Sequence, residues 1–318
     1  MSLVGSALTA AVVATACGTS EVTDTAGDGP IRIVASTNVW GSIAGAVAGE
    51  HAEVEAIIEE PSADPHSFEA SPADAAAITQ ASLVVYNGGG YDEFVDDVLG
   101  SSSRDVPTVE AFTLAENAAD TPDEAAAHDD EDGTDDHSGH VHGAINEHLW
   151  YDTDVVAGVA QQIAEQLSSL DPDNAGAYEA NAEAFGARLA DVDNVIAAIA
   201  ASAPGARVAQ TEPIAHYLVE AAGLDDITPG EFEDAVENGN DPSPAAIADT
   251  LTLVGDKRVR VLIYNIQTES SVTANLRTAA ESAGVPVVEV TETLPEDTDY
   301  LTWLSATTQS LADAVAAN

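Results

Sequence analysis

Short apolar runs alternate with longer amphipathic stretches along this chain. Apolar and β-branched residues concentrate at 31–37, 52–58, 83–88 and 106–112 in the first half, and at 206–211, 258–265 and 285–290 in the second. Helical periodicity marks the stretches 41–49, 71–81, 214–222, 243–255 and 270–283. Short strands separated by helices are typical of βα units. The pattern therefore predicts two α/β lobes, each with a mainly parallel sheet, over residues 31–172 and 203–318.

A long amphipathic stretch separates the two halves. One helix is predicted over 153–170, and a second over 173–202, after the break at Pro172. Apolar residues recur in the second helix at spacings of four and three, at Tyr178, Ala182, Phe185, Leu189, Val192, Ile196 and Ile199. A helix of this length spans roughly 45 Å, so we expect one long rigid helix that joins the lobes. A helical hairpin inside one lobe is the alternative.

The first seventeen residues have the pattern of an export signal. Residues 3–16 form an uncharged apolar run, too short to span a bilayer, that ends in small residues before Cys17. This junction resembles a bacterial lipobox, although no Lys or Arg precedes Arg32. Cys17 is the only cysteine of the chain, so lipid attachment is its predicted role. We expect an extracytoplasmic protein that is anchored to the membrane through Cys17, with residues 18–30 as a flexible tether.

The composition is strongly acidic. The chain has 56 Asp and Glu against 8 Lys and Arg, and a formal net charge of −48. Such a charge repels polyanions, so nucleic acid is excluded as a partner. Salt shortens the Debye length to about 3 Å at 1 M, and the charge therefore indicates a protein adapted to high salt. Solubility of an Ala-rich surface is the alternative explanation.

Histidines gather in one polar segment. Residues 128–148 contain five of the eight histidines. Imidazoles and carboxylates bind divalent transition metals, and a polar tract of them cannot form a core. We interpret residues 115–145 as an acidic His-rich loop whose exposed histidines bind metal weakly, because ordering a flexible segment costs entropy. These histidines are His128, His137, His140 and His142. A solvated acidic run without a metal role is the alternative.

Four further residues lie near the ends of predicted elements. His66 follows the second strand, and His148 precedes the helix at 153–170. His216 lies in the first turn of a helix in the second half, and Glu292 follows the last strand. Loops at the carboxyl ends of strands form the ligand sites of open α/β sheets. A lone histidine is more often structural, but this set from both lobes indicates a shared metal site.

These residues lie in segments that resemble the ZnuA/TroA-like family, the periplasmic metal-binding lipoproteins of zinc and manganese ABC importers. DPHSFEASPADAAAITQASLVVYNGGGYDEF resembles the first metal-ligand segment of the family, NEHLWYD its second, TEPIAHYLVEAAGL its third and IYNIQTESSVTANLRTAAESAGVPVVEVTETLP its last. The likeness covers residues 31–316 in order. It implies two α/β lobes joined by one long rigid helix, with a metal in the interlobe cleft. The implied ligands are His66, His148, His216 and Glu292.

The resemblance also bears on the metal. The fourth ligand of the family varies, so Glu269, Glu289 or a water are alternatives to Glu292. Three imidazoles and one carboxylate suit four-coordinate Zn²⁺, whereas Mn²⁺ favours more oxygen. The third segment resembles that of the manganese branch, which carries a glutamate where His216 stands, so the resemblance implies zinc ahead of manganese. The expected function is capture of Zn²⁺ by a monomer and delivery to a permease that a cytoplasmic ATPase drives.

Two other functions fit parts of the pattern. A zinc hydrolase would keep a water on the metal, with Glu292 as the general base. The chain contains no HExxH motif, however, so we expect no enzymatic activity. A metal-dependent adhesin would use the same fold, because a fold does not determine a function.

Overall fold

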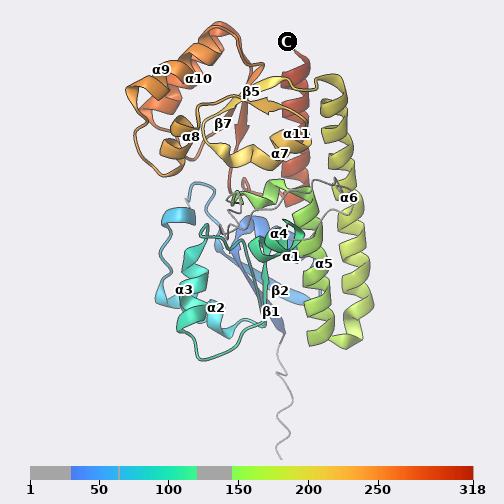
Figure 1. Ribbon diagram of the computed structural model, residues 1–318. Helices are drawn as coiled ribbons and strands as arrows, with labels where there is room; N and C mark the ends of the chain where they lie inside the picture. Colours follow the sequence, from blue (N-terminus) through green and yellow to red (C-terminus); the bar gives the residue numbers. More distant parts are fainter. Residues whose placement is uncertain (1–29, 64, 120–144, 318) are drawn as a thin grey trace, which may run out of the picture. The chain divides into compact units, whose positions relative to one another are not determined.

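The computed structural model describes residues 30–63, 65–119 and 145–317 (Figure 1). Within it, Ile31–Asn318 is one compact unit. The predicted lipid-attachment residue Cys17 and the predicted loop histidines His128, His137, His140 and His142 lie outside the described residues. No helix in the described ranges is both long and apolar enough to cross a bilayer.

The first lobe is built on a four-stranded parallel sheet. Its strands are β1 (Ile31–Thr37), β2 (Ala52–Ile58), β3 (Leu83–Tyr86) and β4 (Thr108–Glu110), in the order β2-β1-β3-β4. Its helices are α1 (Asn38–Ala48), α2 (Pro72–Gln80), α3 (Glu93–Ser101), α4 (Ala111–Ala119) and α5 (Thr153–Leu170). The central strand β1 buries Ile33 and Val34 on opposite faces, as expected for a parallel sheet covered on both sides.

The second lobe repeats this topology. Its strands are β5 (Arg207–Gln210), β6 (Asp225–Asp226), β7 (Val261–Asn265) and β8 (Val287–Val290), in the parallel order β6-β5-β7-β8. Its helices are α7 (His216–Ala221), α8 (Gly230–Glu237), α9 (Pro244–Gly255), α10 (Ser271–Ala283) and α11 (Tyr300–Ala316). The predicted fold class of two parallel α/β lobes is confirmed.

The structure also corrects several predicted boundaries. The run at 106–112 is a strand only over Thr108–Glu110, because the chain turns into α4 at Ala111. The run at 258–265 begins its strand at Val261, after a turn in which Lys257 has a left-handed φ of 55°. Helices α3, α4 and α11 were not among the predicted stretches. The sequence pattern also showed no sign of β6 and α8, which are short and whose acidic composition hides an apolar pattern.

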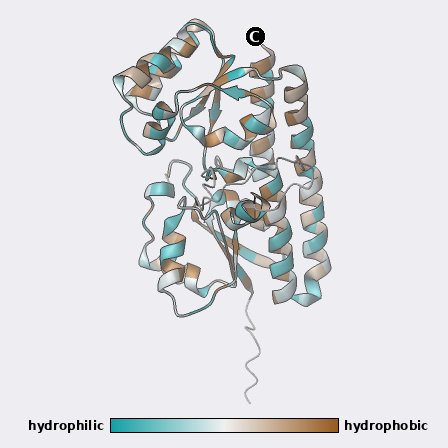
Figure 2. Cartoon of the chain, in the orientation of Figure 1, coloured by the Kyte–Doolittle hydropathy of each residue, from teal (hydrophilic) through white to brown (hydrophobic). Residues whose placement is uncertain are grey.

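Helix α6 (Ala175–Ser202) joins the lobes. Its buried side chains are the seven that the spacing predicted, from Tyr178 to Ile199, and they belong to one hydrophobic core that includes residues of both sheets. The helix packs against α1 and α5 of the first lobe and against α7 and α11 of the second. Figure 1 shows it alongside α5 and α11. In Figure 2 hydrophilic positions alternate with hydrophobic ones along these outer helices. The long connecting helix is therefore confirmed.

Hydrogen bonds also join the lobes directly. The Asn38 side chain donates to the Leu294 carbonyl at 3.0 Å and accepts from the Leu294 amide at 2.9 Å. The Tyr300 hydroxyl donates to the Trp150 carbonyl at 2.6 Å. These bonds hold the connection between β8 and α11 against the first lobe, which positions the residues that follow β8.

Candidate metal site

A cavity of about 620 Å³ opens where loops of both lobes meet. The first lobe contributes His66, from the turn η1 (Pro65–Ser67) after β2, and Glu147. The second lobe contributes Glu212, Glu237, Gln267 and Glu292. His66, Glu212, Gln267 and Glu292 come from connections that follow a strand, so the cavity lies at the carboxyl ends of the sheets. We call it the acidic cleft.

His148 is buried beside this cleft and held in one tautomer. It precedes the turn η2 (Leu149–Tyr151) and is 1% exposed. The Asn146 amide nitrogen donates to the Pro213 carbonyl at 3.1 Å, so the amide oxygen faces His148 and accepts from its Nδ1 at 3.0 Å. The lone pair of the ring is therefore on Nε2. Burial, followed by the charges of His66 and His216, lowers the pKa of His148 to about 3, which keeps it in the neutral form that binds metals.

His66 lies between His148 and the carboxylates. Its Nδ1 is 3.6 Å from Glu147 Oε1, and its Nε2 is 4.0 Å from Glu292 Oε2. The edge of its ring packs against Tyr91, with the centroids 4.9 Å apart. The structure thus brings His66, His148 and Glu292 together across the interface of the lobes, as the sequence predicted for these three residues.

Two buried carboxylates of the second lobe share one amide. The Asn265 side chain donates to Glu292 Oε1 at 2.9 Å and also to Glu212 Oε1. The Tyr91 hydroxyl donates to the other oxygen of Glu292 at 3.3 Å. Glu212 and Glu292 are both nearly inaccessible to solvent. This arrangement orients two carboxylates toward the same point, as a site for a divalent cation requires.

His216 does not join this cluster. It lies on α7 with its side chain 48% exposed, and its Nε2 is 3.7 Å from Glu220 on the same helix. The charge of His216 contributes to the lowered pKa of His148, but His216 is absent from the lining of the acidic cleft. Glu212, four residues earlier, takes the buried position after β5. The structure therefore places Glu212, and not His216, beside the other predicted ligands.

Glu212 carried a signal that the sequence reasoning missed. Strand β5 is followed by Thr211 and Glu212, and strand β8 is followed by Thr291 and Glu292. The same dipeptide thus follows two strands that lie on either side of β7. Because the sheet is parallel, residues at equal distances beyond these strands reach the same edge.

The proposed alternatives to Glu292 are less well placed. Glu289 is half exposed and pairs with Arg277 at 2.6 Å. Glu269 lines the acidic cleft, but it accepts a hydrogen bond from the Tyr264 hydroxyl at 3.0 Å. The buried position of Glu292 makes it the better candidate.

Glu237 is a further residue that the sequence did not reveal. One ligand atom each of His66, His148 and Glu237 lie within 4.8 Å of one another. Burial, and then the charges of Glu212, Glu147 and Glu292, raise the pKa of Glu237 to about 9. Carboxylates that repel each other in this way gain stability when a cation lies between them. The acidic cleft is therefore suited to a divalent metal ion.

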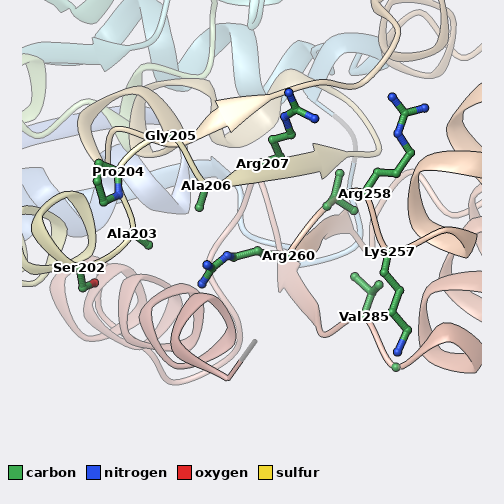
Figure 3. Close-up of a pocket in the computed structure, with 12 residues that line it drawn as sticks. Ser202, Ala203, Pro204, Gly205, Ala206, Arg207, Lys257, Arg258, Arg260 and Val285 are labelled. Carbon is green, nitrogen blue, oxygen red and sulfur yellow. The ribbon is translucent and has the colours of Figure 1, made fainter.

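A second cavity of about 480 Å³ lies at the amino end of the second sheet (Figure 3). Its lining includes four of the 8 Lys and Arg residues, which are Arg207, Lys257, Arg258 and Arg260. Helices α6, α9, α10 and α11 end here, and their C-terminal carbonyls attract cations. Arg260, for example, donates to the Val315 carbonyl of α11 at 3.1 Å. Figure 3 shows that the four cationic side chains diverge, so they form no common site.

Comparison with known proteins agrees with this description. The family described as "ZnuA: Zinc-uptake complex component A periplasmic" matches residues 33–314. The chain is 28% identical over 246 residues to the manganese-binding lipoprotein MntA of Halalkalibacterium halodurans, covering 71% of this chain and 73% of that protein. It is 25% identical over 237 residues to the high-affinity zinc uptake system protein ZnuA of Bacillus subtilis, covering 74% and 71%.

A solved structure has the same fold. The periplasmic zinc binding protein TroA from Treponema pallidum superposes with a TM-score of 0.70, over 90% of this chain and 99% of that chain, at 15% identity. The two proteins therefore share the arrangement of two lobes.

Proposed function

This chain belongs to the ZnuA family, whose members are metal-binding solute-binding proteins of ABC importers and not enzymes, and we propose that its cargo is Mn²⁺. The donor set of the acidic cleft carries this proposal. Two imidazoles, of His66 and His148, lie beside the buried carboxylates of Glu212 and Glu292. Mn²⁺ favours oxygen ligands and higher coordination, whereas a tetrahedral zinc site is richer in nitrogen or sulfur.

The two lobes would bind the ion jointly. His148 is neutral and its Nε2 lone pair is available, so binding displaces no proton from this residue. Asn265 keeps both carboxylates oriented before the ion arrives. The ion would neutralise carboxylates that otherwise repel one another, and this gain supports tight capture.

Zinc is the second candidate. The sequence favours zinc through His216 and through the four histidines from His128 to His142. Zn²⁺ also binds most nitrogen and oxygen sites more tightly than Mn²⁺. The argument from His216 is weaker, because this residue lies outside the lining of the acidic cleft. The histidines from His128 to His142 and the higher affinity of Zn²⁺ still favour zinc.

The metal content of the protein is the direct test. We expect protein isolated from its own cell envelope without chelator to carry Mn²⁺, and chelator-treated protein to bind one equivalent of Mn²⁺ in calorimetry. His66→Ala should lower that affinity at least about tenfold, since even partners outside the ligand shell cost 10–100-fold. Isolation with zinc alone, together with no measurable Mn²⁺ binding, would make zinc the cargo.

The setting in the cell follows from the family and from the N-terminal sequence. We propose that a lipid on Cys17 holds the monomer outside the membrane, beside an ABC permease with a cytoplasmic ATPase. The histidines of segment 115–145 would raise the local metal supply. Cys17→Ser should release the protein from the membrane fraction, and retention of this variant after a high-salt wash would contradict the anchor.

A further inference from the structure

Helix α8 ends at the acidic cleft, where its last residue, Glu237, contributes a carboxylate to the lining. Phe232 and Val236 of this helix are buried in the second lobe, which fixes its orientation. Glu237, its last residue, is 16% exposed, and its Oε1 lies 3.4 Å from His148 Nε2 of the first lobe. A residue of one lobe thus meets a buried histidine of the other.

The two atoms in this contact are both electron-pair donors. Nδ1 of His148 gives its proton to Asn146, so Nε2 presents a lone pair to the Glu237 carboxylate. The second oxygen of Glu237 is buried and has no hydrogen-bond partner among the described residues. At this distance the two atoms need a positive centre between them, which is either a proton carried by Glu237 or a metal ion. His66 supplies a third donor within 4.8 Å.

We propose that Glu237 is a metal ligand supplied by α8, additional to the ligands at the strand ends, and that it selects for ions that accept a third carboxylate. This inference rests on the proposed function of the acidic cleft. With Glu237 the donors are two imidazoles and the carboxylates of Glu212, Glu237 and Glu292. Five donors exceed the four of a tetrahedral zinc site and suit the higher coordination of Mn²⁺.

A positioning role is the competing explanation. Glu237 would then only orient His148 by a hydrogen bond, and the metal would not touch it. The coordination number separates the two roles, because loss of a ligand changes it and loss of a positioning contact does not. Co²⁺ reports this number, since its visible absorption is weak in five- and six-coordinate sites and strong in tetrahedral ones.

The experiment compares Glu237→Gln with two controls in the full chain. Glu231→Gln removes an exposed carboxylate from the same helix, and His66→Ala tests the cleft itself. We expect Glu237→Gln to weaken Mn²⁺ binding at least about tenfold and Zn²⁺ binding less than about threefold. The visible absorption of bound Co²⁺ should rise. Glu231→Gln should change none of these quantities.

Each outcome has a distinct meaning. Unchanged Mn²⁺ affinity and unchanged Co²⁺ absorption in Glu237→Gln, with His66→Ala strongly impaired, would overturn the role of Glu237 and leave the proposed function intact. A loss of Mn²⁺ affinity without any change in Co²⁺ absorption would overturn ligation in favour of positioning. Normal metal binding by His66→Ala would instead overturn the proposed function. The glutamine keeps the size of Glu237, and an unchanged melting temperature of the metal-free variant would show that it folds.

Discussion

Single residues decide which side chains line the acidic cleft. Thr211 and Thr291 each follow a strand of the second sheet, and their hydroxyls hold the local backbone. Thr211 Oγ1 accepts from the backbone N–H of Asn265 at 3.0 Å, and Thr291 Oγ1 donates to the Thr293 carbonyl at 2.8 Å. The glutamate after each threonine accepts a hydrogen bond from the same side-chain nitrogen of Asn265. The two glutamates therefore lie close together because each stands two residues beyond the end of a strand in the same sheet.

Our first prediction contrasts the two candidate ligands from the third segment. Glu212→Gln should lower metal affinity at least about tenfold, whereas His216→Ala should change it less than about threefold, because only Glu212 is buried in the cleft. Isothermal titration of both chelator-treated variants with Mn²⁺ and Zn²⁺ measures this. The opposite ranking would restore His216 as the ligand that the sequence implied.

At the scale of elements, α8 and β6 interact through a pair of acidic residues, Glu233 and Asp226. Burial, and then the charge of Asp226, raise the pKa of Glu233 to about 9. Asp226 in turn accepts from Gln210 at 2.6 Å and from Thr228. Glu233 is therefore protonated at neutral pH in the folded protein, while the unfolded chain would ionise it near its ordinary value.

The second prediction follows from this difference. Since the folded state binds the proton more tightly, Glu233 stabilises the fold fully only below its ordinary pKa, and this stability is lost as the pH rises through about 9. The free energy of unfolding of the metal-free protein should fall between pH 5 and pH 9, and that of the Glu233→Gln variant should fall less over the same range. Denaturant titrations at several pH values measure this. Equal slopes for both proteins would show that Glu233 titrates normally.

The third prediction concerns α6, whose apolar face packs against both lobes. Leu189 is in the middle of the helix and almost fully buried. Leu189→Ala should destabilise the protein by about 2–5 kcal/mol, the usual cost of a core leucine. Asp191→Ala, an exposed position on the same helix, should change stability by less than about 0.5 kcal/mol. Because one core includes both sheets, thermal unfolding should remain a single transition; separate melting of two lobes would contradict this.

At the scale of the whole molecule, negative charge dominates. The ion pairs of arginines with carboxylates in the described ranges are exposed or half exposed, and they involve Arg188, Arg207 and Arg277. Exposed pairs of this kind contribute little, and 8 cationic residues cannot balance 56 acidic ones. The folded state therefore keeps most of its self-repulsion unless salt screens it.

The fourth prediction is a dependence of stability on salt. Raising KCl from 0.01 M to 1 M shortens the Debye length from about 30 Å to about 3 Å, so the metal-free protein should melt at a clearly higher temperature in 1 M KCl. A chelator-treated melting series across KCl concentrations measures this. A flat or falling trend would show that the acidic surface costs the fold no stability.

The sequence by itself determined the features that depend on local periodicity. The seven buried positions of α6 follow from the 3.6-residue repeat, because one helix face must meet one core. The strands at 31–37 and 52–58 were predicted with their observed bounds for a similar reason. His66 and Glu292 follow predicted strands, whose ends share an edge in a parallel sheet, whereas His148 was identified by the resemblance of its segment to the second ligand segment of the family.

Only the tertiary structure decided which acidic side chains complete the site. Glu212 and His216 lie four residues apart near the start of one helix, and the Thr-Glu pair that Glu212 shares with the end of β8 ranks them only once both strand ends are known. The turn η4 (Pro213–Ala215) directs Glu212 into the cleft and leaves His216 on the surface. Glu237 comes within 3.4 Å of His148, 89 positions away in the chain, because Phe232 and Val236 pack α8 into the second lobe. A contact between side chains this distant in sequence is set by packing of the lobes, which leaves no periodic signal in the sequence around either residue.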